Sequence, residues 1–291
     1  MINRLTLIGV GLIGGSLARA LRDAGHVQEI VGYGRGLANL QRAVELGVVD
    51  RIETSLAAAV NGADMVVLAT PVGAMAEILG AIAPYLAKDA VVTDVGSVKG
   101  AVVTAARAAL GGRFSNFVPG HPIAGTERSG VESSFASLYV GRRVVLTPLP
   151  ETRPEALARV RAMWQAAGAD VVDMSIEHHD QVLAATSHLP HLLAYALVDM
   201  LAQLNDRHEI FSYAAGGFRD FTRIASSDPV MWRDISLANR DAIVEMLKRY
   251  RTELDGLIKA VAAGNGGSLQ ELFARAKAAR DALMQNDQKK D

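Results

Sequence analysis

Six of the seven histidines of this chain lie between His121 and His208, and His121 is the one best placed for proton transfer. It closes a short apolar run, Phe117 to Pro122, whose pattern is typical of a strand. An imidazole just past the end of a strand suits a general base, because its ordinary pKa lies near neutral pH. A structural histidine, hydrogen-bonded at a turn, is the alternative of equal weight.

Ser97 is the second candidate, because it follows the neighbouring apolar segment Ala90 to Val95. A hydroxyl there can orient the imidazole or contact the same substrate oxygen. Taken alone, Ser97 is better explained as a helix cap.

The remaining histidines fall at helical spacings. His188 and His191 are three residues apart and share one helix face. Because the H-E-x-x-H pattern and an acidic third ligand are missing, metal binding is disfavoured. The pair is expected to line a polar pocket or to pack in the core. The cluster formed by residues 178–180 (His-His-Asp) is expected to be a capped, solvated helix start, with a pocket wall or subunit contact as the alternative.

Arg219 and Arg223 are four residues apart, one helical turn, in a segment otherwise rich in Phe, Gly and Thr. Two guanidinium groups on one face suit recognition of a carboxylate. A surface network with Asp220 explains the same residues equally well.

These side chains need a scaffold, and the start of the chain specifies it. A buried strand, Leu5 to Val10, leads into Gly9-x-Gly11-x-x-Gly14 and then into a helix with apolar residues at helical spacing. This is the context that a dinucleotide-binding fingerprint requires. We expect the phosphates to bind at the turn and the helix N-terminus, formed by Gly9, Gly11, Leu12, Ile13 and Gly14.

The end of the next strand, Gln28 to Tyr33, bears on cofactor choice. NAD-binding units usually carry a carboxylate there for the ribose 2′-hydroxyl, but this chain has Gly34 and Arg35. An arginine can pair with a 2′-phosphate, which favours NADP over NAD; a solvated Arg35 in a permissive site is the alternative. Thr70 and Pro71, after a later strand, are expected to border the cofactor.

Strands alternate with helices up to residue 173, and from Ser175 onward the pattern is helical. The predicted fold class is therefore α/β, with a Rossmann-type, doubly wound parallel sheet followed by an all-α domain. We place the dinucleotide-binding domain at residues 1–173 and the helical, substrate-binding and dimerisation domain at 174–291.

Composition narrows the function further. The 291 residues carry a net charge of −1, which gives no support to nucleic-acid binding. The chain has no cysteine, so thiolate metal sites and cysteine nucleophiles are excluded. No signal peptide and no stretch long enough to cross a membrane is recognised, and we expect a cytoplasmic protein.

Several motifs together resemble those of the prephenate and arogenate dehydrogenases of tyrosine biosynthesis. The resemblance runs from the first strand to about residue 260, and the motifs around His121 and Arg223 are far more specific than the glycines. The motifs are Gly-Val-Gly-Leu-Ile-Gly-Gly-Ser (9–16), Asp-Val-Gly-Ser-Val-Lys (94–99), Gly-His-Pro-Ile-Ala-Gly-Thr-Glu (120–127), Ser-His-Leu-Pro-His (187–191), Gly-Gly-Phe-Arg-Asp-Phe-Thr-Arg-Ile-Ala (216–225) and Asp-Pro-Val-Met-Trp-Arg-Asp (228–234).

The resemblance implies oxidative decarboxylation of prephenate or arogenate, with hydride transfer to NADP or NAD and without a metal. It implies that His121 accepts the ring-hydroxyl proton while Ser97 hydrogen-bonds that hydroxyl. By the same resemblance Arg223 binds a substrate carboxylate and His191 lies near the side-chain end. Thr126, Glu127 and Gly216 are expected to shape the pocket.

The resemblance also implies a homodimer formed through the helical domain. The chain ends soon after that domain, so no mutase or regulatory domain is expected. Another NADP-dependent reductase of the same plan, such as a β-hydroxyacid dehydrogenase, is the alternative. Those enzymes use a lysine on the helical domain, where Lys248 and Lys259 are expected on an exposed face. A non-catalytic dinucleotide sensor is a further alternative, which Ser97 and His121 argue against.

Overall fold

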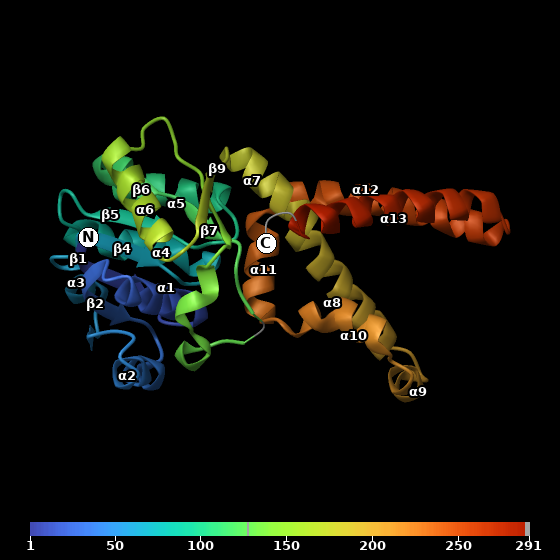
Figure 1. Cartoon of the computed structure of the whole chain (residues 1–291), viewed down its shortest axis with the longest axis horizontal. Coiled ribbons are helices and arrows are strands. Elements are labelled where there is room, and N and C mark those ends of the chain that lie inside the picture. The colour runs from blue at the N-terminus through green and yellow to red at the C-terminus, as the bar shows by residue number, and fades with distance from the viewer. Residues whose placement is uncertain (127, 289–291) are drawn as a thin grey trace. The chain divides into compact units, whose positions relative to one another are not determined.

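A computed structural model describes residues 1–126 and 128–288 of the chain (Figure 1). The chain divides into two compact units, Met1–Ile243 and Val244–Asp291, and each is described by itself. The boundary suggested by the sequence, at residue 173, falls inside the first unit and stays a prediction.

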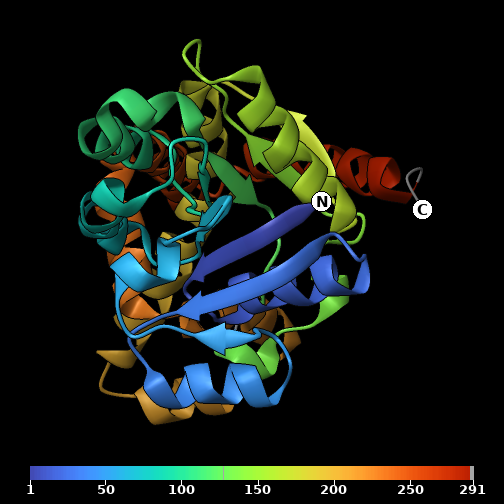
Figure 2. The ribbon, with the colours of Figure 1, turned by 90° about the vertical axis from the view of Figure 1, so that its left-hand side faces the viewer.

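The first unit is built around a parallel sheet with the strand order β3-β2-β1-β4-β5-β6 (Figure 2). In this doubly wound order the chain starts at the centre and reverses direction after β3, so the carboxyl ends of β1 and β4 flank a crevice. The expected α/β class and parallel sheet are thus confirmed. The strands are β1 (Ile2–Ile8), β2 (Val27–Tyr33), β3 (Arg51–Ile52), β4 (Met65–Leu68), β5 (Val91–Asp94) and β6 (Phe117–Val118).

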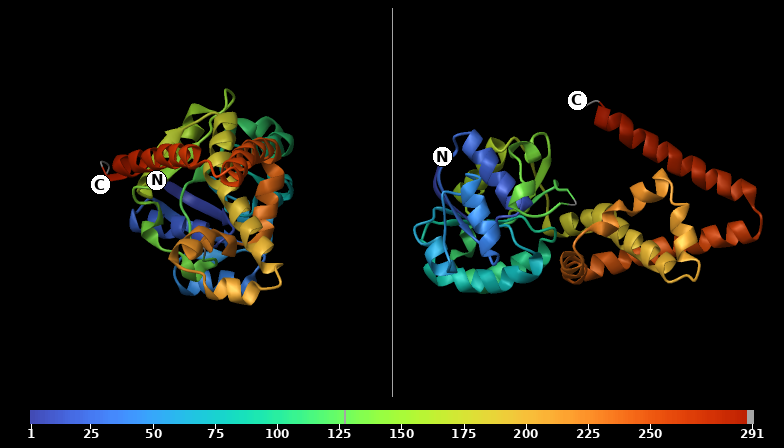
Figure 3. Two further views of the ribbon diagram at one scale, coloured as in Figure 1. Left: turned by 90° about the vertical axis from the view of Figure 1, so that its right-hand side faces the viewer. Right: turned by 90° about the horizontal axis from the view of Figure 1, so that it is seen from below.

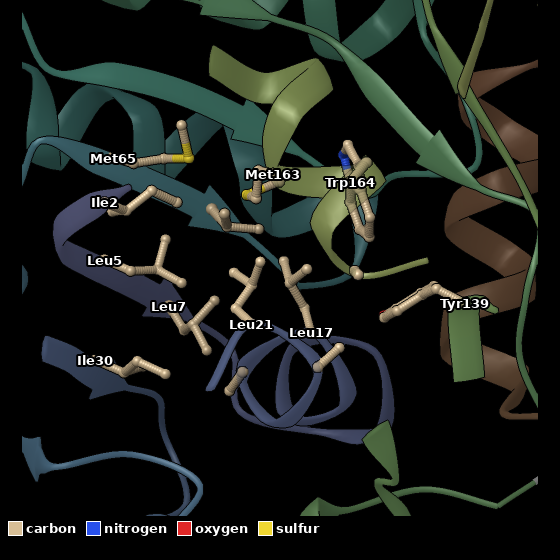
Figure 4. Packing of buried hydrophobic residues seen from close by; sticks show 14 of the residues in the cluster. Ile2, Leu5, Leu7, Leu17, Leu21, Ile30, Met65, Tyr139, Met163 and Trp164 are labelled. Carbon is tan, nitrogen blue, oxygen red and sulfur yellow. The ribbon is translucent and has the colours of Figure 1, made fainter. Parts of the chain in front are cut away.

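Helices cover both faces of this sheet, which explains why its central strands read as continuous apolar runs. One face buries side chains of α1 (Leu12–Asp23), α2 (Leu37–Glu45) and α6 (Pro154–Ala166), and Figure 4 shows Leu17 and Leu21 of α1 within that cluster. The helices on the opposite face are α3 (Leu56–Val60), α4 (Val72–Ile82) and α5 (Gly100–Leu110).

A second, smaller sheet follows, with the order β7-β8-β9. Its strands are β7 (Gly120–Pro122), β8 (Arg143–Leu146) and β9 (Asp170–Asp173), of which β7 is antiparallel to β8. The predicted strand-like run Phe117 to Pro122 is therefore divided at Pro119, which has no N–H for a sheet ladder. His121 lies inside β7, paired with Val145, and not past the end of a strand.

The helical part begins at Ile176, as the pattern predicts, and its first long segment is interrupted before Pro190. It consists of α7 (Ile176–Leu183), a π-helical turn (Ala184–His188) and α8 (Leu189–Ala202). Pro190 accounts for the break, because it lacks an N–H and its ring crowds the carbonyl four residues earlier. Three shorter helices follow, α9 (Arg207–Ser212), α10 (Gly216–Thr222) and α11 (Pro229–Ala238).

The second unit consists of the greater part of α12 (Arg240–Ala262) together with α13 (Gly266–Gln288), and the chain turns back between them (Figure 3). Within residues 1–126 and 128–288, none of the helices combines the length and the apolar character that a membrane crossing requires.

Candidate active site

The glycine turn after β1 has the geometry that its spacing predicts. Gly9 has a φ of +100°, a conformation that side chains disfavour. A Cβ atom on Gly14 would collide with the carbonyl of Gly9, so the third glycine allows α1 to approach the strand. A Cβ on Gly11 would meet no atom within 4 Å, which leaves that backbone open to a ligand.

A cavity of about 460 Å³ lies beside this turn. Gly9, Gly11, Gly34, Arg35, Thr70 and Pro71, all expected at the cofactor, line it. Leu12, Ile13 and Gly14 belong to α1 and are not among the lining residues. The buried hydroxyl of Thr70 has no hydrogen-bond partner in the described part of the chain. An open glycine and an unpaired hydroxyl in one cavity fit a polar ligand such as a dinucleotide.

Sequence reasoning missed one wall of this cavity. Gly130 lines it together with Asn39, whose side chain accepts from the backbone N–H of Val131 at 3.0 Å and donates to the Val10 carbonyl at 2.7 Å. Asn39 thus ties the segment after residue 128 to the glycine turn. Sequence periodicity carries no signal for such a contact between distant loops.

The carboxyl end of β5 holds a buried ion pair that the sequence did not reveal. Lys99 and Asp94 both have fully buried side chains, and the ammonium donates to the carboxylate at 2.5 Å. Lys99 Nζ also donates to the carbonyl of Gly120 at 2.6 Å, which fixes the backbone beside His121. Ser97 lies in the loop between β5 and α5; it does not cap α5, whose first residue is Gly100.

His121 forms a connected polar chain with two residues of α7. Its Nδ1 atom lies 2.9 Å from Nε2 of His179, and Nδ1 of His179 lies 2.8 Å from the Asp180 carboxylate. His179 is completely buried, so the expected solvated helix start is wrong for this residue, whereas His178 is exposed. Ser175 caps α7 by accepting from the N–H of His178.

The surroundings keep His121 neutral. Burial has the largest effect, and the positive charge of Lys99 adds to it, so the pKa of His121 lies well below its ordinary value. His179 and His188 act in the same direction. A neutral imidazole at working pH is the form that can accept a proton.

His188 and His191 flank the ring of Trp232. His191 stacks on it with ring centroids 3.7 Å apart, and His188 meets it edge-on at 6.0 Å. Asn239 donates to Nδ1 of His188 at 3.1 Å, while Nε2 of His188 is buried without a partner in the described residues. Burial lowers the pKa of His188 to about 4, so the ring is neutral and Nε2 carries an unpaired N–H.

The structure defines the surroundings of the predicted substrate-binding residues less closely than those of His121. The positive charge of Arg223 contributes, after burial, to a lowered pKa of His191, which places the two residues within electrostatic range. Thr126 is exposed and accepts from the N–H of Arg128, and Gly216 is the exposed first residue of α10. Glu127 lies outside the described residues.

Histidine and carboxylate side chains do not form a metal-binding group in the part of the chain that the structure describes. Lys248 and Lys259, considered for the alternative reductase chemistry, lie exposed on α12. The buried ionisable groups Asp94, Lys99, His121 and His179 lie around the end of β5 and the start of α7.

Comparison with known families matches both parts of the chain. Residues 17–173 match the family described as prephenate dehydrogenase, nucleotide-binding domain, and residues 175–275 match prephenate dehydrogenase, dimerization domain. The cyclohexadienyl dehydrogenase of Zymomonas mobilis is 39% identical over 285 residues, which are 97% of each chain.

Solved structures agree with these matches. The structure of prephenate dehydrogenase from Aquifex aeolicus in complex with hydroxyphenyl propionate and NAD+ superposes with a TM-score of 0.91 at 39% identity, over 97% of this chain and 99% of that one. Synechocystis arogenate dehydrogenase superposes with a TM-score of 0.79 at 32% identity, over 96% and 99% of the two chains.

Proposed function

Because the chain belongs to the prephenate dehydrogenase family, we propose that it oxidises and decarboxylates prephenate or arogenate with NAD(P)+, as an enzyme of tyrosine biosynthesis. The products are 4-hydroxyphenylpyruvate from prephenate and tyrosine from arogenate. The observation that carries the proposal is the buried, neutral His121, hydrogen-bonded on one nitrogen and placed next to the end of β5. The family match does not favour the β-hydroxyacid dehydrogenase alternative.

His121 acts in this proposal through its Nε2 atom. It accepts the proton of the ring hydroxyl as the carbon that bears this hydroxyl loses a hydride and becomes a carbonyl carbon. When bound, the oxidised nicotinamide supplies the hydride acceptor. Ser97 hydrogen-bonds the same hydroxyl. Loss of the ring carboxylate as carbon dioxide then makes the ring aromatic, and general-base help of this kind contributes roughly 10²- to 10⁴-fold in rate.

Arg223 and the two histidines beside Trp232 recognise the anionic substrate. A guanidinium can bind a carboxylate through two hydrogen bonds, and Arg223 lies within electrostatic range of His191. The unpaired N–H of His188 fits an oxygen acceptor of the substrate. We assign Thr126, Glu127 and Gly216 to the pocket on the family resemblance alone.

The nucleotide-binding domain and its cavity support NAD(P) as the cofactor, and within that choice we propose a preference for NADP. Gly34 and Arg35 line the cavity, and a carboxylate does not follow β2 directly. The Aquifex aeolicus relative was crystallised with NAD+, so the comparison structure does not argue for this preference.

We also propose a cytoplasmic homodimer formed through the helical part, residues 174–291. The matched family domain is described as a dimerization domain. In the second unit, Tyr250, Leu254, Ile258 and Val261 are exposed on α12 at helical spacing, which is the pattern of a helix face that packs against a partner.

The experiment that tests the function is a steady-state assay of the purified chain with each substrate and each cofactor. Absorbance of the reduced nicotinamide reports the oxidation, and the aromatic product is identified by chromatography. We expect turnover with at least one of the two substrates. Absence of reduced nicotinamide with both substrates and both cofactors would reject the proposal.

A further inference from the structure

His121 can act as the base only if its Nε2 atom carries the lone pair. We propose that His179 and Asp180 are positioning residues that hold His121 in this tautomer. This inference rests on the proposed role of His121, but the arrangement of protons that it requires can be measured without a substrate.

The positions of the ring protons follow from Asp180, which is the last residue in this chain of hydrogen bonds. An ionised carboxylate can only accept, so Asp180 Oδ1, 2.8 Å away, places a proton on Nδ1 of His179. In the proposed arrangement this is the single proton of the His179 ring, so Nε2 of His179 is an acceptor. It lies 2.9 Å from Nδ1 of His121, which must therefore carry the proton of that ring. Nε2 of His121 is left with its lone pair, and no side chain of the described residues hydrogen-bonds it.

Asp180 is held in the state that this arrangement requires. Burial alone would raise the pKa of its carboxyl group. Hydrogen bonds from His179 and from the backbone N–H groups of Lys99 and Gly100 outweigh burial, so the pKa lies below its ordinary value. The two backbone bonds measure 2.8 and 2.9 Å, and they also fix the carboxylate at the first turn of α5.

The surroundings remove competing partners. His179 has no exposed surface, so water cannot replace it as the acceptor for His121. The two rings meet edge-on, at an interplanar angle of 68°, which suits a hydrogen bond from the edge of one ring to the edge of the other. The geometry therefore fits a hydrogen bond in which His121 donates and His179 accepts.

Proton transfer to Nε2 leaves the hydrogen bonds to His179 and Asp180 in place. When the hydroxyl O–H bond breaks and the Nε2–H bond forms, His121 becomes an imidazolium next to the ammonium of Lys99, in a buried site. The Nδ1 atom of His121 stays hydrogen-bonded to His179, whose other ring nitrogen donates to Asp180. Because His179 and Asp180 belong to α7 and His121 to β7, the base is complete only when α7 is docked against the nucleotide-binding part.

The tautomer can be read directly by ¹⁵N NMR of the histidine rings in the wild-type chain without substrate. We expect a protonated Nδ1 and an unprotonated Nε2 for His121, assigned by the loss of its signals in His121→Asn. A protonated Nε2 in neutral His121 would overturn the proposal. The tautomer of His121 can be measured whether or not the chain turns over prephenate or arogenate. Turnover of these substrates is the separate test of the proposed function.

Three variants distinguish a positioning role of His179 from a purely structural one. His179→Leu removes the acceptor, and we expect kcat to fall between about 10²- and 10⁴-fold, with the substrate KM within about threefold of wild type and His121 shifted toward the Nε2–H tautomer. His179→Gln restores an acceptor, and kcat should stay within about tenfold of wild type. His178→Leu, at the exposed neighbouring position, is the matched control and should leave kcat unchanged.

Wild-type kcat in His179→Leu, or equal losses in the Leu and Gln variants, would overturn the positioning role. If His179→Leu does not fold, the wild-type tautomer and the kcat of His179→Gln still decide the question.

Discussion

The carboxylate of Asp234, on α11, lies against the backbone of Gly73, in the first turn of α4. A Cβ atom at Gly73 would stand 2.8 Å from Cγ of Asp234 and still closer to one of its oxygens. Arg233 holds the other oxygen of the same carboxylate at 2.7 Å. The helix that carries Trp232 therefore packs directly on the helix that follows Thr70 and Pro71 at the nucleotide cavity.

This contact predicts opposite effects for two similar substitutions in α4. Gly73→Ala should destabilise the protein by roughly 1–3 kcal/mol, because the new methyl group overlaps Asp234. Gly80→Ala is the matched control: a Cβ there meets nothing within 4 Å, and better helix propensity should stabilise by up to about 1 kcal/mol. Denaturant unfolding measures both. Stabilisation by Gly73→Ala would show that Asp234 moves aside without cost.

The glycine turn shows how much of this fold is local enough to predict. Each of the three glycines has a separate requirement that the spacing encodes, and the structure contains all three. The split of the run Phe117 to Pro122 between two sheets is not encoded in this way. The residues after Pro119 join the second sheet because they pair with β8. That strand lies more than twenty residues further along the chain.

His179 shows which part of the candidate site could not be predicted from the sequence. A helix start with two histidines and an aspartate has the composition of a solvated end, and local pattern gives no sign of burial. The burial of His179 comes from His121, 58 residues away, and from the backbone of Lys99 and Gly100, which Asp180 caps. The orphaned N–H of His188 depends in the same way on Asn239, 51 residues away. His121 and Arg223, by contrast, stand in motifs specific enough to identify.

Cofactor choice can be tested where β2 ends. Gly34→Asp places a carboxylate beside the cavity, with room for it because a Cβ there is 3.6 Å from its nearest neighbour, Leu40. The carboxylate should accept from a ribose 2′-hydroxyl and repel a 2′-phosphate. We expect the ratio of kcat/KM for NADP+ to that for NAD+ to fall by about 10- to 100-fold, since each 1.4 kcal/mol is tenfold.

Arg35→Ser should lower kcat/KM with NADP+ and leave that with NAD+ unchanged. Arg275→Ser, which removes the same charge from α13, is the control and should alter neither. A wild-type chain that prefers NAD+ would reject the assignment of Arg35 to a 2′-phosphate.

Substrate recognition can be tested at Arg223, directly after α10. Arg223→Ala should raise the KM for the substrate by about 10- to 100-fold, because an arginine–carboxylate pair contributes roughly 1.5–3 kcal/mol. The KM for the cofactor should change little. Arg219→Ala, one helical turn earlier and exposed, is the matched control. Equal substrate KM values for the two variants would remove Arg223 from the pocket.

The buried histidines predict how stability depends on pH. The pKa of His188 is lowered to about 4 by burial, so below its ordinary value of 6.5 the unfolded chain binds a proton that the folded chain does not. The free energy of unfolding should therefore decrease as the pH falls from 6.5 to 4, and His188 should account for about 3 kcal/mol of the decrease.

His188→Asn keeps an acceptor for Asn239 and cannot titrate, so its unfolding free energy should decrease less over this pH range. His178→Asn changes an exposed histidine and should follow the wild type. Denaturant titrations at several pH values give these slopes, and identical slopes for His188→Asn and wild type would contradict the assignment.

The most direct test of the account is the turnover of His121→Asn. If His121 takes the hydroxyl proton, kcat should fall by about 10²- to 10⁴-fold, while the Kd for NADP+ measured by calorimetry stays within about twofold of wild type. Turnover close to the wild-type value, with prephenate or arogenate as substrate, would contradict the assignment of His121 as the base.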